Sequence, residues 1–341
     1  MHRLSDFDYN LPPEQIAQHP LPDRAASRLF VLDRATGNTR HLHFGDLLTL
    51  IPPGDLLVLN TSRVIPARLH GKRDTGNAEI LLVRELSDGA WLAMGHPGGK
   101  LKPGRRITFG EDSAVEIVEM LGGGLRRIRF VGALDARATL AKYGEVPLPP
   151  YIRRPPTAAD RERYQTVYAT HDGSVAAPTA GLHFTTELLA RIHEAGIVVT
   201  AIDLHVGPGT FKPVETEDIA AHVMHAEAYE ISDGAAGWIN KKMGVRRGVW
   251  GVGTTVVRAL ESAAQAAGQV RAGAGETSLF IRPPYDFKVV TRLITNFHLP
   301  RSTLLMLVCA FGGYEHVMEA YREAVREGYR FYSYGDAMAI I

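Results

Sequence analysis

Six short stretches of alternating polar and apolar residues lie between residues 64 and 131, and this pattern constrains the fold more than any other feature of the chain. Alternation with a period of two places the apolar side chains on one face of a β-strand. Turn-forming clusters such as Ser87-Asp88-Gly89 separate the stretches. Strands at this regular spacing predict a small antiparallel barrel or sandwich. The stretches are 64–70, 78–86, 90–96, 105–110, 114–121 and 125–131.

On both sides of this module, helix and strand patterns alternate. We expect helices over 186–195, 254–267 and 314–327, each ended by a glycine, and strands over 197–206 and 248–252. Such alternation indicates an α/β layer architecture. The first 55 or so residues lack the β pattern and are assigned to the same α/β part, which makes the β module an insertion. The predicted division is an α/β core of residues 1–56 and 149–341 with an inserted domain of residues 57–148.

Composition excludes several classes of protein. The formal net charge is +1, so no global field draws the chain to nucleic acid or to a membrane surface. The one cysteine, Cys309, excludes a disulfide framework and a cysteine-based metal site, and this usage is typical of a reducing compartment. The longest apolar run, 304–311, is far shorter than the ~20 residues of a spanning helix and is expected to form a core helix. We therefore expect a cytoplasmic protein without a membrane span.

Four segments rich in glycine, histidine and small polar residues lie where strands and helices meet. In open α/β sheets ligands bind beyond the carboxyl ends of the strands, and glycine lets the backbone approach a ligand closely. Taken singly, each segment could equally be an ordinary loop. The segments are 178–184, 205–211, 251–258 and 295–303.

The segment 251–258 combines a Gly-x-Gly turn, which is a weak signal alone, with a helix start. A strand, a Gly-x-Gly turn and a helix start at Gly253, Thr254 and Thr255 would expose unpaired N–H groups suited to a carboxylate or a phosphate. The third glycine of a dinucleotide fingerprint would fall at Val256, which argues against a Rossmann site. The alternative is a plain helix N-cap.

His222-x-x-His225-x-Glu227 invites a metal interpretation, because residues three apart can share a helix face. The spacing does not match a metalloprotease motif, and no further ligand set accompanies it. We therefore predict no metal. A histidine beside a carboxylate is instead a workable acid/base pair.

Two stretches, 56–73 and 238–258, contain several basic residues and no acid. Such stretches suit contacts to a phosphate backbone, or else form a solvated face that binds nothing. The candidate phosphate contacts are Arg63, Arg68, Arg153 and Arg258.

Taken together, these segments resemble the S-adenosylmethionine:tRNA ribosyltransferase-isomerase family of queuosine biosynthesis. The chain departs from the family pattern at Trp250, Val256, Thr291 and Ala339, none of which is a predicted catalytic position. The matching stretches cover the chain in order: 11–20, 60–69, 148–152, 164–169, 177–184, 204–211, 253–261, 295–305 and 334–338.

The resemblance implies an α/β core domain with an inserted small antiparallel six-stranded β-barrel. It also implies a reaction in which the ribosyl part of S-adenosylmethionine moves to 7-aminomethyl-7-deazaguanine at the wobble position of tRNA. Adenine and methionine leave, and the product is epoxyqueuosine. S-adenosylmethionine is then a co-substrate, with no true cofactor and no metal. The implied partners are the tRNAs with GUN anticodons, those for Tyr, His, Asn and Asp. A monomer without an obligate protein partner is expected.

This chemistry needs positioning and proton transfers but no protein nucleophile, because the substrate's own amine attacks the ribosyl carbon. We assign candidate roles on that basis. The acid/base candidates are His183, His205, His225, Glu227 and His298. The candidates for binding S-adenosylmethionine are Gly181, Gly207, Gly209, Thr210, Gly253, Thr254, Thr255 and Asn296.

Two other classes of function stay open. A conventional tRNA methyltransferase would also bind S-adenosylmethionine and RNA, although the N-terminal part of the chain lacks the glycine-rich βα loop that such enzymes carry. A non-catalytic RNA-binding protein would have a basic or aromatic surface without the clustered His, Asn and Thr segments.

Overall fold

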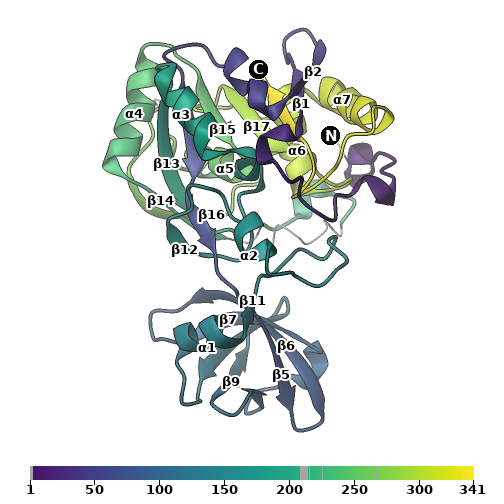
Figure 1. Ribbon diagram of the computed structural model, residues 1–341, viewed down its shortest axis with the longest axis vertical. Coiled ribbons are helices and arrows are strands. Elements are labelled where there is room, and N and C mark those ends of the chain that lie inside the picture. Colours follow the sequence, from purple (N-terminus) through teal and green to yellow (C-terminus); the bar gives the residue numbers. More distant parts are fainter. Residues whose placement is uncertain (1–2, 208–213, 215, 225, 266–267) are drawn as a thin grey trace.

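The chain folds into an α/β core and a separate β-barrel (Figure 1), as seen in a computed structural model. The structure describes residues 3–207, 214, 216–224, 226–265 and 268–341. Figure 1 shows the core above and the barrel below, joined near β11 (Gly144–Glu145).

The core is built on a nine-stranded mixed sheet whose four neighbouring strands β13, β3, β15 and β17 run parallel. The apolar sequence of β3 is typical of such a strand, because parallel strands are covered on both faces. In spatial order the strands are β16 (Gly273–Thr277), β14 (Glu227–Ile231), β13 (Val198–Leu204), β3 (Leu56–Asn60), β15 (Val249–Val252), β17 (Arg292–Asn296), β18 (Ala337–Ile340), β1 (Arg28–Leu32) and β2 (Thr39–His43).

Helices cover both faces of this sheet, and successive residues of a strand face opposite layers. In β3, Leu57 and Leu59 pack in one hydrophobic cluster, while Leu56 and Val58 pack in the other. The first cluster includes residues of η4 (Phe44–Thr49) and α3 (Thr186–Glu194). The second cluster includes residues of α4 (Asp233–Gly244), α5 (Thr254–Ala263), α6 (Thr303–Gly312) and α7 (Tyr314–Arg326).

The inserted domain is a closed six-stranded barrel, which confirms the expected fold class. Every neighbouring pair is antiparallel, and pairing of Lys72 with Thr108 joins the first strand to the last. The apolar positions of the alternating stretches fill its interior, including Leu69, Ile80 and Ile117. Around the barrel the strands are β5 (Arg68–Arg73), β6 (Gly76–Glu85), β7 (Trp91–His96), β10 (Leu125–Phe130), β9 (Ser113–Met120) and β8 (Arg106–Phe109).

The crossing from core to barrel lies later in the chain than the predicted boundary at residue 57. That residue is inside β3, all five residues of which are buried in the core sheet. The predicted strand over 64–70 is also divided: β4 (Ser62–Val64) pairs with β12 (His171–Ser174) beside the core, and the barrel begins only at Arg68. Pro66 lies in this break, where its missing N–H removes a donor that a continuous strand would use.

The buried helix α6 and several shorter elements complete the fold. Helix α6 is almost entirely buried, as expected for the apolar run 304–311. Within the described residues, no helix has the length and apolar character needed to cross a membrane. The remaining elements are α1 (Ala136–Tyr143), α2 (Asp160–Arg163), η1 (Leu4–Phe7), η2 (Pro13–Gln15), η3 (Arg24–Ala26), η5 (Gly98–Lys100), η6 (Thr179–His183) and η8 (Ile219–Ala221).

Candidate functional site

One pocket is lined by residues of all four segments singled out from the sequence, and three of these segments supply most of the lining. It lies at the carboxyl ends of the adjacent parallel strands β15 and β17, as expected for an α/β sheet. The fourth segment contributes Val206. The lining of the pocket includes Ala176, Ala177, Pro178, Thr179, Ala180, Gly253, Thr254, Thr255, Thr295, Asn296, Phe297, His298, Tyr151, Tyr164, Tyr332 and Ser333.

The N-terminus of α5 forms one wall of the pocket. Gly253 precedes the helix with a φ of 96°, a left-handed value that suits glycine. No described side chain caps the helix, and the Thr255 hydroxyl is buried without a hydrogen-bond partner among the described residues. A helix N-terminus carries a partial positive charge and free N–H donors. This wall is therefore suited to an anionic group such as a carboxylate.

Asn296, at the end of β17, presents a hydrogen-bond acceptor in the pocket. Its Nδ2 donates to the Tyr332 carbonyl at 3.0 Å and to His183 Nε2 at 3.1 Å, which fixes the orientation of the amide. Its Oδ1 is buried and has no partner among the described residues. Tyr332 itself adopts a φ of 74°, which is uncommon for a residue other than glycine. A ligand that donates a hydrogen bond would satisfy Asn296 Oδ1.

His183 lies behind Asn296, buried against Phe44 with ring centroids 5.0 Å apart. Because Nε2 accepts from Asn296, the proton of the neutral ring is on Nδ1, which donates to Ser27 Oγ at 2.7 Å. Burial, reinforced by Arg24 and Arg330, lowers the pKa of His183 to about 3. Both ring nitrogens are engaged in hydrogen bonds. The geometry of His183 therefore fits a role in positioning Asn296 better than it fits the predicted acid/base role.

His298 lines the pocket directly. Its Nε2 lies 2.8 Å from Thr295 Oγ1, its backbone N–H donates to the Tyr321 hydroxyl at 3.2 Å, and its carbonyl accepts from Tyr9. Burial lowers the pKa of His298 to about 3. The imidazole is therefore neutral near pH 7.

The other acid/base candidates lie elsewhere. His205 packs against Gly173, where an added Cβ would come within 2.6 Å of Nδ1, and burial lowers the pKa of His205. Glu227 forms a buried ion pair with Arg258 and accepts from the Gly207 N–H at 3.0 Å. His225 lies outside the described residues, so its predicted pairing with Glu227 stays a prediction.

The pairing with Glu227 also corrects the prediction for Arg258. Its guanidinium donates to the carbonyls of Leu279 at 3.1 Å and Thr277 at 3.3 Å, and the side chain is 3% exposed. A cation that is buried and fully engaged cannot reach an RNA phosphate. Its role here is to hold Glu227, which in turn holds the Gly207 backbone.

The remaining predicted RNA contacts differ in exposure. Arg68 is partly buried between Glu79, at 3.0 Å, and the Leu148 carbonyl, at 3.1 Å. Arg63 is about half exposed and donates to the Ala169 carbonyl at 2.7 Å. Arg153 is exposed. Arg63 and Arg153 are thus the two predicted contacts that solvent reaches freely.

Some of the predicted S-adenosylmethionine contacts line the pocket and others do not. Gly253, Thr254, Thr255 and Asn296 line the pocket. Gly181 is buried beside it, where an added Cβ would lie 2.1 Å from the Tyr168 hydroxyl, so close packing accounts for this glycine. Gly209 and Thr210 lie outside the described residues.

Sequence reasoning missed the tyrosines of the pocket. The rings of Tyr151 and Tyr332 lie 3.9 Å apart between centroids, and the Tyr151 hydroxyl lies 2.7 Å from Ser333 Oγ. Tyr151 belongs to the Pro-rich stretch 147–156, but a single aromatic residue there carries no pattern that separates a pocket wall from core packing. Among the described residues, no three His, Cys, Asp or Glu side chains cluster in a way that could hold a metal ion.

Comparison with known proteins identifies the family. Residues 4–340 match the family described as "Queuosine biosynthesis protein". The S-adenosylmethionine:tRNA ribosyltransferase-isomerase of Thermus thermophilus is 53% identical over 351 residues, covering 100% of both chains. The enzyme of the same name from Moorella thermoacetica is 51% identical, covering 99% of this chain and 100% of the relative.

A solved structure agrees with these relatives. The crystal structure of the S-adenosylmethionine tRNA ribosyltransferase of Thermotoga maritima is 38% identical and covers 98% of this chain and 100% of its own, with a TM-score of 0.58. A match over nearly the whole chain, together with the core, the barrel and the strand-end pocket, leads to one conclusion: the chain belongs to the queuosine biosynthesis protein family.

Proposed function

We propose that the chain is an S-adenosylmethionine:tRNA ribosyltransferase-isomerase and that the pocket at the ends of β15 and β17 holds S-adenosylmethionine. The reaction moves and isomerises the ribosyl group onto 7-aminomethyl-7-deazaguanine of tRNA, giving epoxyqueuosine and releasing adenine and methionine. Relatives that match over nearly their full length bear this enzyme's name. The observation that carries the assignment of the pocket is the pair of buried, unpartnered oxygens, Thr255 Oγ1 and Asn296 Oδ1, beside a helix N-terminus that no described side chain caps.

The methionine carboxylate belongs at the N-terminus of α5 in this proposal. Backbone N–H groups of the first turn and the Thr255 hydroxyl would donate to it, and the helix dipole favours its negative charge. A ligand without a phosphate is sufficient here, because S-adenosylmethionine supplies its own anionic group.

The ribosyl group and the sulfonium then lie toward the rest of the lining. Asn296 Oδ1 would accept from a ribosyl hydroxyl, because it is a fixed acceptor without another donor among the described residues. The paired rings of Tyr151 and Tyr332 offer aromatic faces, which attract a cation such as the sulfonium. The protein contributes to this chemistry by orienting the reactive cation with groups held in fixed positions.

His298 is the imidazole that lines the pocket among the described candidates. With a pKa near 3 it is a weak base at neutral pH, since an effective acid or base has a pKa close to the working pH. We propose that it serves as a neutral hydrogen-bonding group beside the substrate.

The finer statements about partners also belong to the proposal. We infer that the substrates are tRNAs with GUN anticodons, with Arg63 and Arg153 as exposed cations available for RNA phosphates. The monomeric state and the cytoplasmic location stay predictions from the sequence.

The direct test is to incubate the protein with S-adenosylmethionine and tRNA bearing 7-aminomethyl-7-deazaguanine, then to identify the nucleosides by mass spectrometry and to quantify free adenine and methionine. Epoxyqueuosine with equimolar adenine and methionine is the expected result. A methylated nucleoside with S-adenosylhomocysteine would instead establish a methyltransferase. Tight tRNA binding without turnover would establish a binding protein.

A further inference from the structure

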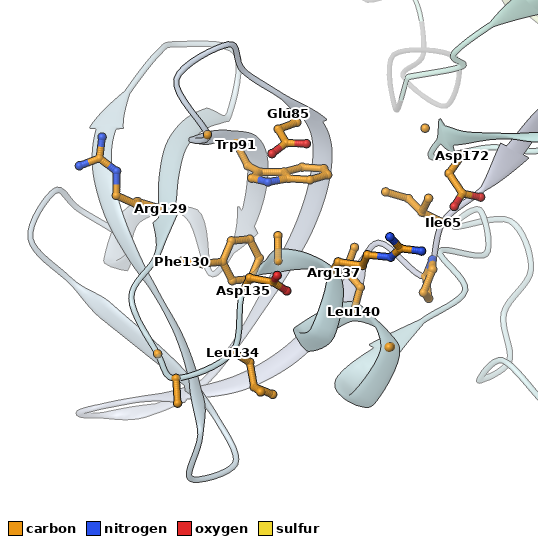
Figure 2. A pocket seen from close by; sticks show the side chains of 17 residues that line it. Ile65, Glu85, Trp91, Arg129, Phe130, Leu134, Asp135, Arg137, Leu140 and Asp172 are labelled. Atoms are coloured by element: carbon orange, nitrogen blue, oxygen red, sulfur yellow. The ribbon is translucent and has the colours of Figure 1, made fainter.

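A second and larger cavity, of about 950 Å³, lies between the barrel and the core (Figure 2). Its barrel wall includes residues of β6, β7, β10 and α1, and its core wall is formed by Ile65, Pro66 and the β12 residues Asp172 and Gly173. We call this cavity the interdomain cleft. Ligand sites for small molecules have volumes of about 300–1,000 Å³, so the cleft can accept more than one ring-sized group.

The barrel wall of the cleft combines aromatic surface with an unused donor. Figure 2 shows the rings of Trp91 and Phe130 on the barrel side, facing the space across from Ile65 and Asp172. Trp91 is 9% exposed, and its Nε1 is buried without a hydrogen-bond partner among the described residues. Buried N–H groups are nearly always paired in folded proteins. This donor therefore points to an acceptor that arrives with a ligand.

The charges of the cleft distinguish between kinds of ligand. The lining contains two cations, Arg129 and Arg137, and three acids, Glu85, Asp135 and Asp172. A groove that tracks a phosphate backbone needs an excess of cations, which this lining lacks. Mixed donors and acceptors beside aromatic faces instead match the edges and faces of unpaired bases, which is how proteins recognise RNA loops.

The cleft is also close to the S-adenosylmethionine pocket. Gly173 lines the cleft and Ala176 lines the pocket, and three residues of fully extended chain span at most about 11 Å. Stacked nucleotides rise by about 3.4 Å each, so bases a few positions apart in one loop can reach both places.

We infer that the interdomain cleft binds unpaired bases of the tRNA anticodon loop that neighbour the modified base. Trp91 Nε1 donates to an acceptor on a base edge, and Phe130 provides a stacking face. The inference rests on the proposed function, because it takes tRNA as the substrate. It assigns the barrel a share of substrate recognition.

The experiment measures binding of two RNAs to the full-length protein at several salt concentrations. One RNA is a hairpin that carries the anticodon stem and loop, and the other is a fully paired duplex of the same stem. The variants are Phe130→Leu, which removes the aromatic face, and Trp91→Phe, which removes the N–H and keeps a ring. Arg105→Ala is the matched surface control, because Arg105 is an exposed barrel residue outside the cleft lining.

We expect Phe130→Leu to weaken hairpin binding about tenfold, since stacking of a base on an aromatic ring has an effect of that order. Trp91→Phe should weaken it by about three- to tenfold through the lost hydrogen bond. The dependence of affinity on salt should keep its slope in both variants, because no phosphate contact is removed. Duplex binding, S-adenosylmethionine binding and the circular dichroism spectrum should stay as in the wild type.

Hairpin affinities equal to that of the wild type in both folded variants would overturn the inference. Equal losses for hairpin and duplex would overturn it too, since paired bases cannot enter the cleft. The proposed function is judged separately, from epoxyqueuosine formation by the wild-type protein. A wild type that binds the hairpin through the cleft but makes no epoxyqueuosine would refute the enzyme and leave the cleft assignment standing.

Discussion

The orientation of Asn296 depends on a serine that does not touch the pocket, and this dependence yields a sharp prediction. Ser27 Oγ donates to the Arg24 carbonyl at 3.2 Å and accepts from His183 Nδ1 at 2.7 Å. It thereby holds the ring proton on Nδ1 and keeps Nε2 as the acceptor for Asn296. Substitution of Ser27 by alanine removes the acceptor for Nδ1–H, so the Asn296 amide is held less firmly with Oδ1 toward the pocket.

Two magnitudes follow from this geometry. Ser27 and His183 are 3% and 4% exposed, so the orphaned N–H stays away from water and should cost about 1–3 kcal/mol of the free energy of unfolding. A ligand hydrogen bond to Asn296 Oδ1 is worth about 0.5–1.5 kcal/mol, so affinity for S-adenosylmethionine should fall about two- to tenfold.

The assay combines calorimetric titration with S-adenosylmethionine, unfolding in denaturant and ¹⁵N NMR of the His183 ring, which reports the tautomer. Ser113→Ala is the matched control, because Ser113 is equally buried and bonded to Thr139 at 2.6 Å but lies in the barrel. The Ser113→Ala variant should be less stable than the wild type but should bind S-adenosylmethionine with the same affinity. If Ser27→Ala likewise lost stability but kept its affinity and its His183 tautomer, the positioning role of His183 would be refuted.

Three further predictions concern single features of the core. Thr255→Val should weaken S-adenosylmethionine binding several-fold in calorimetry and leave the unfolding midpoint unchanged, since the hydroxyl has no partner among the described residues; a lower midpoint with normal affinity would contradict this. Arg258→Met leaves Glu227 buried without its cation and should lower the free energy of unfolding in denaturant by about 3–5 kcal/mol. The control Arg105→Met, at an exposed ion pair, should lower it by less than about 1 kcal/mol. Equal losses would show that the buried ion pair contributes no more to stability than the exposed one. His183 and His298 have pKa values of about 3, below the ordinary value of 6.5, so the unfolded state binds protons first as the pH falls. Stability should therefore decline from pH 6.5 toward pH 3, by at most about 3 kcal/mol per pH unit from these two groups together, and a slope unchanged in His183→Gln would exclude His183 as a source.

The barrel was predictable because its signal is local. Each strand reports its inner face by alternation within about six to eight residues, and glycine-rich turns divide the strands. Closure into a barrel follows from six such strands that bury a single core. The residue at which the insertion begins was harder to predict from the sequence, because β3 and the barrel strands are both apolar and short. Only pairing with β13 and β15 places β3 in the core sheet.

The site was predictable in part for the same reason. The rule that ligands bind at the carboxyl ends of parallel strands selects Gly253 to Thr255 and Asn296 from the sequence, and the pocket contains them. The roles of the histidines were not predictable, because burial and partners decide whether an imidazole is charged. His183 is a weak base through burial and through contacts with Ser27 and Asn296, which lie 156 and 113 residues away in the chain.

Local periodicity and turn chemistry encode the two kinds of architecture, their order along the chain and the small polar segments that end the strands, so these features could be predicted before the fold was known. The tertiary structure alone decided what each polar group does. It buried Arg258 against Glu227, turned His183 into a support for Asn296, and placed Trp91 and Phe130 opposite Asp172 across the interdomain cleft. Charge state, exposure and hydrogen-bond partners depend on residues distant in sequence, and these residues come together only when both domains are packed.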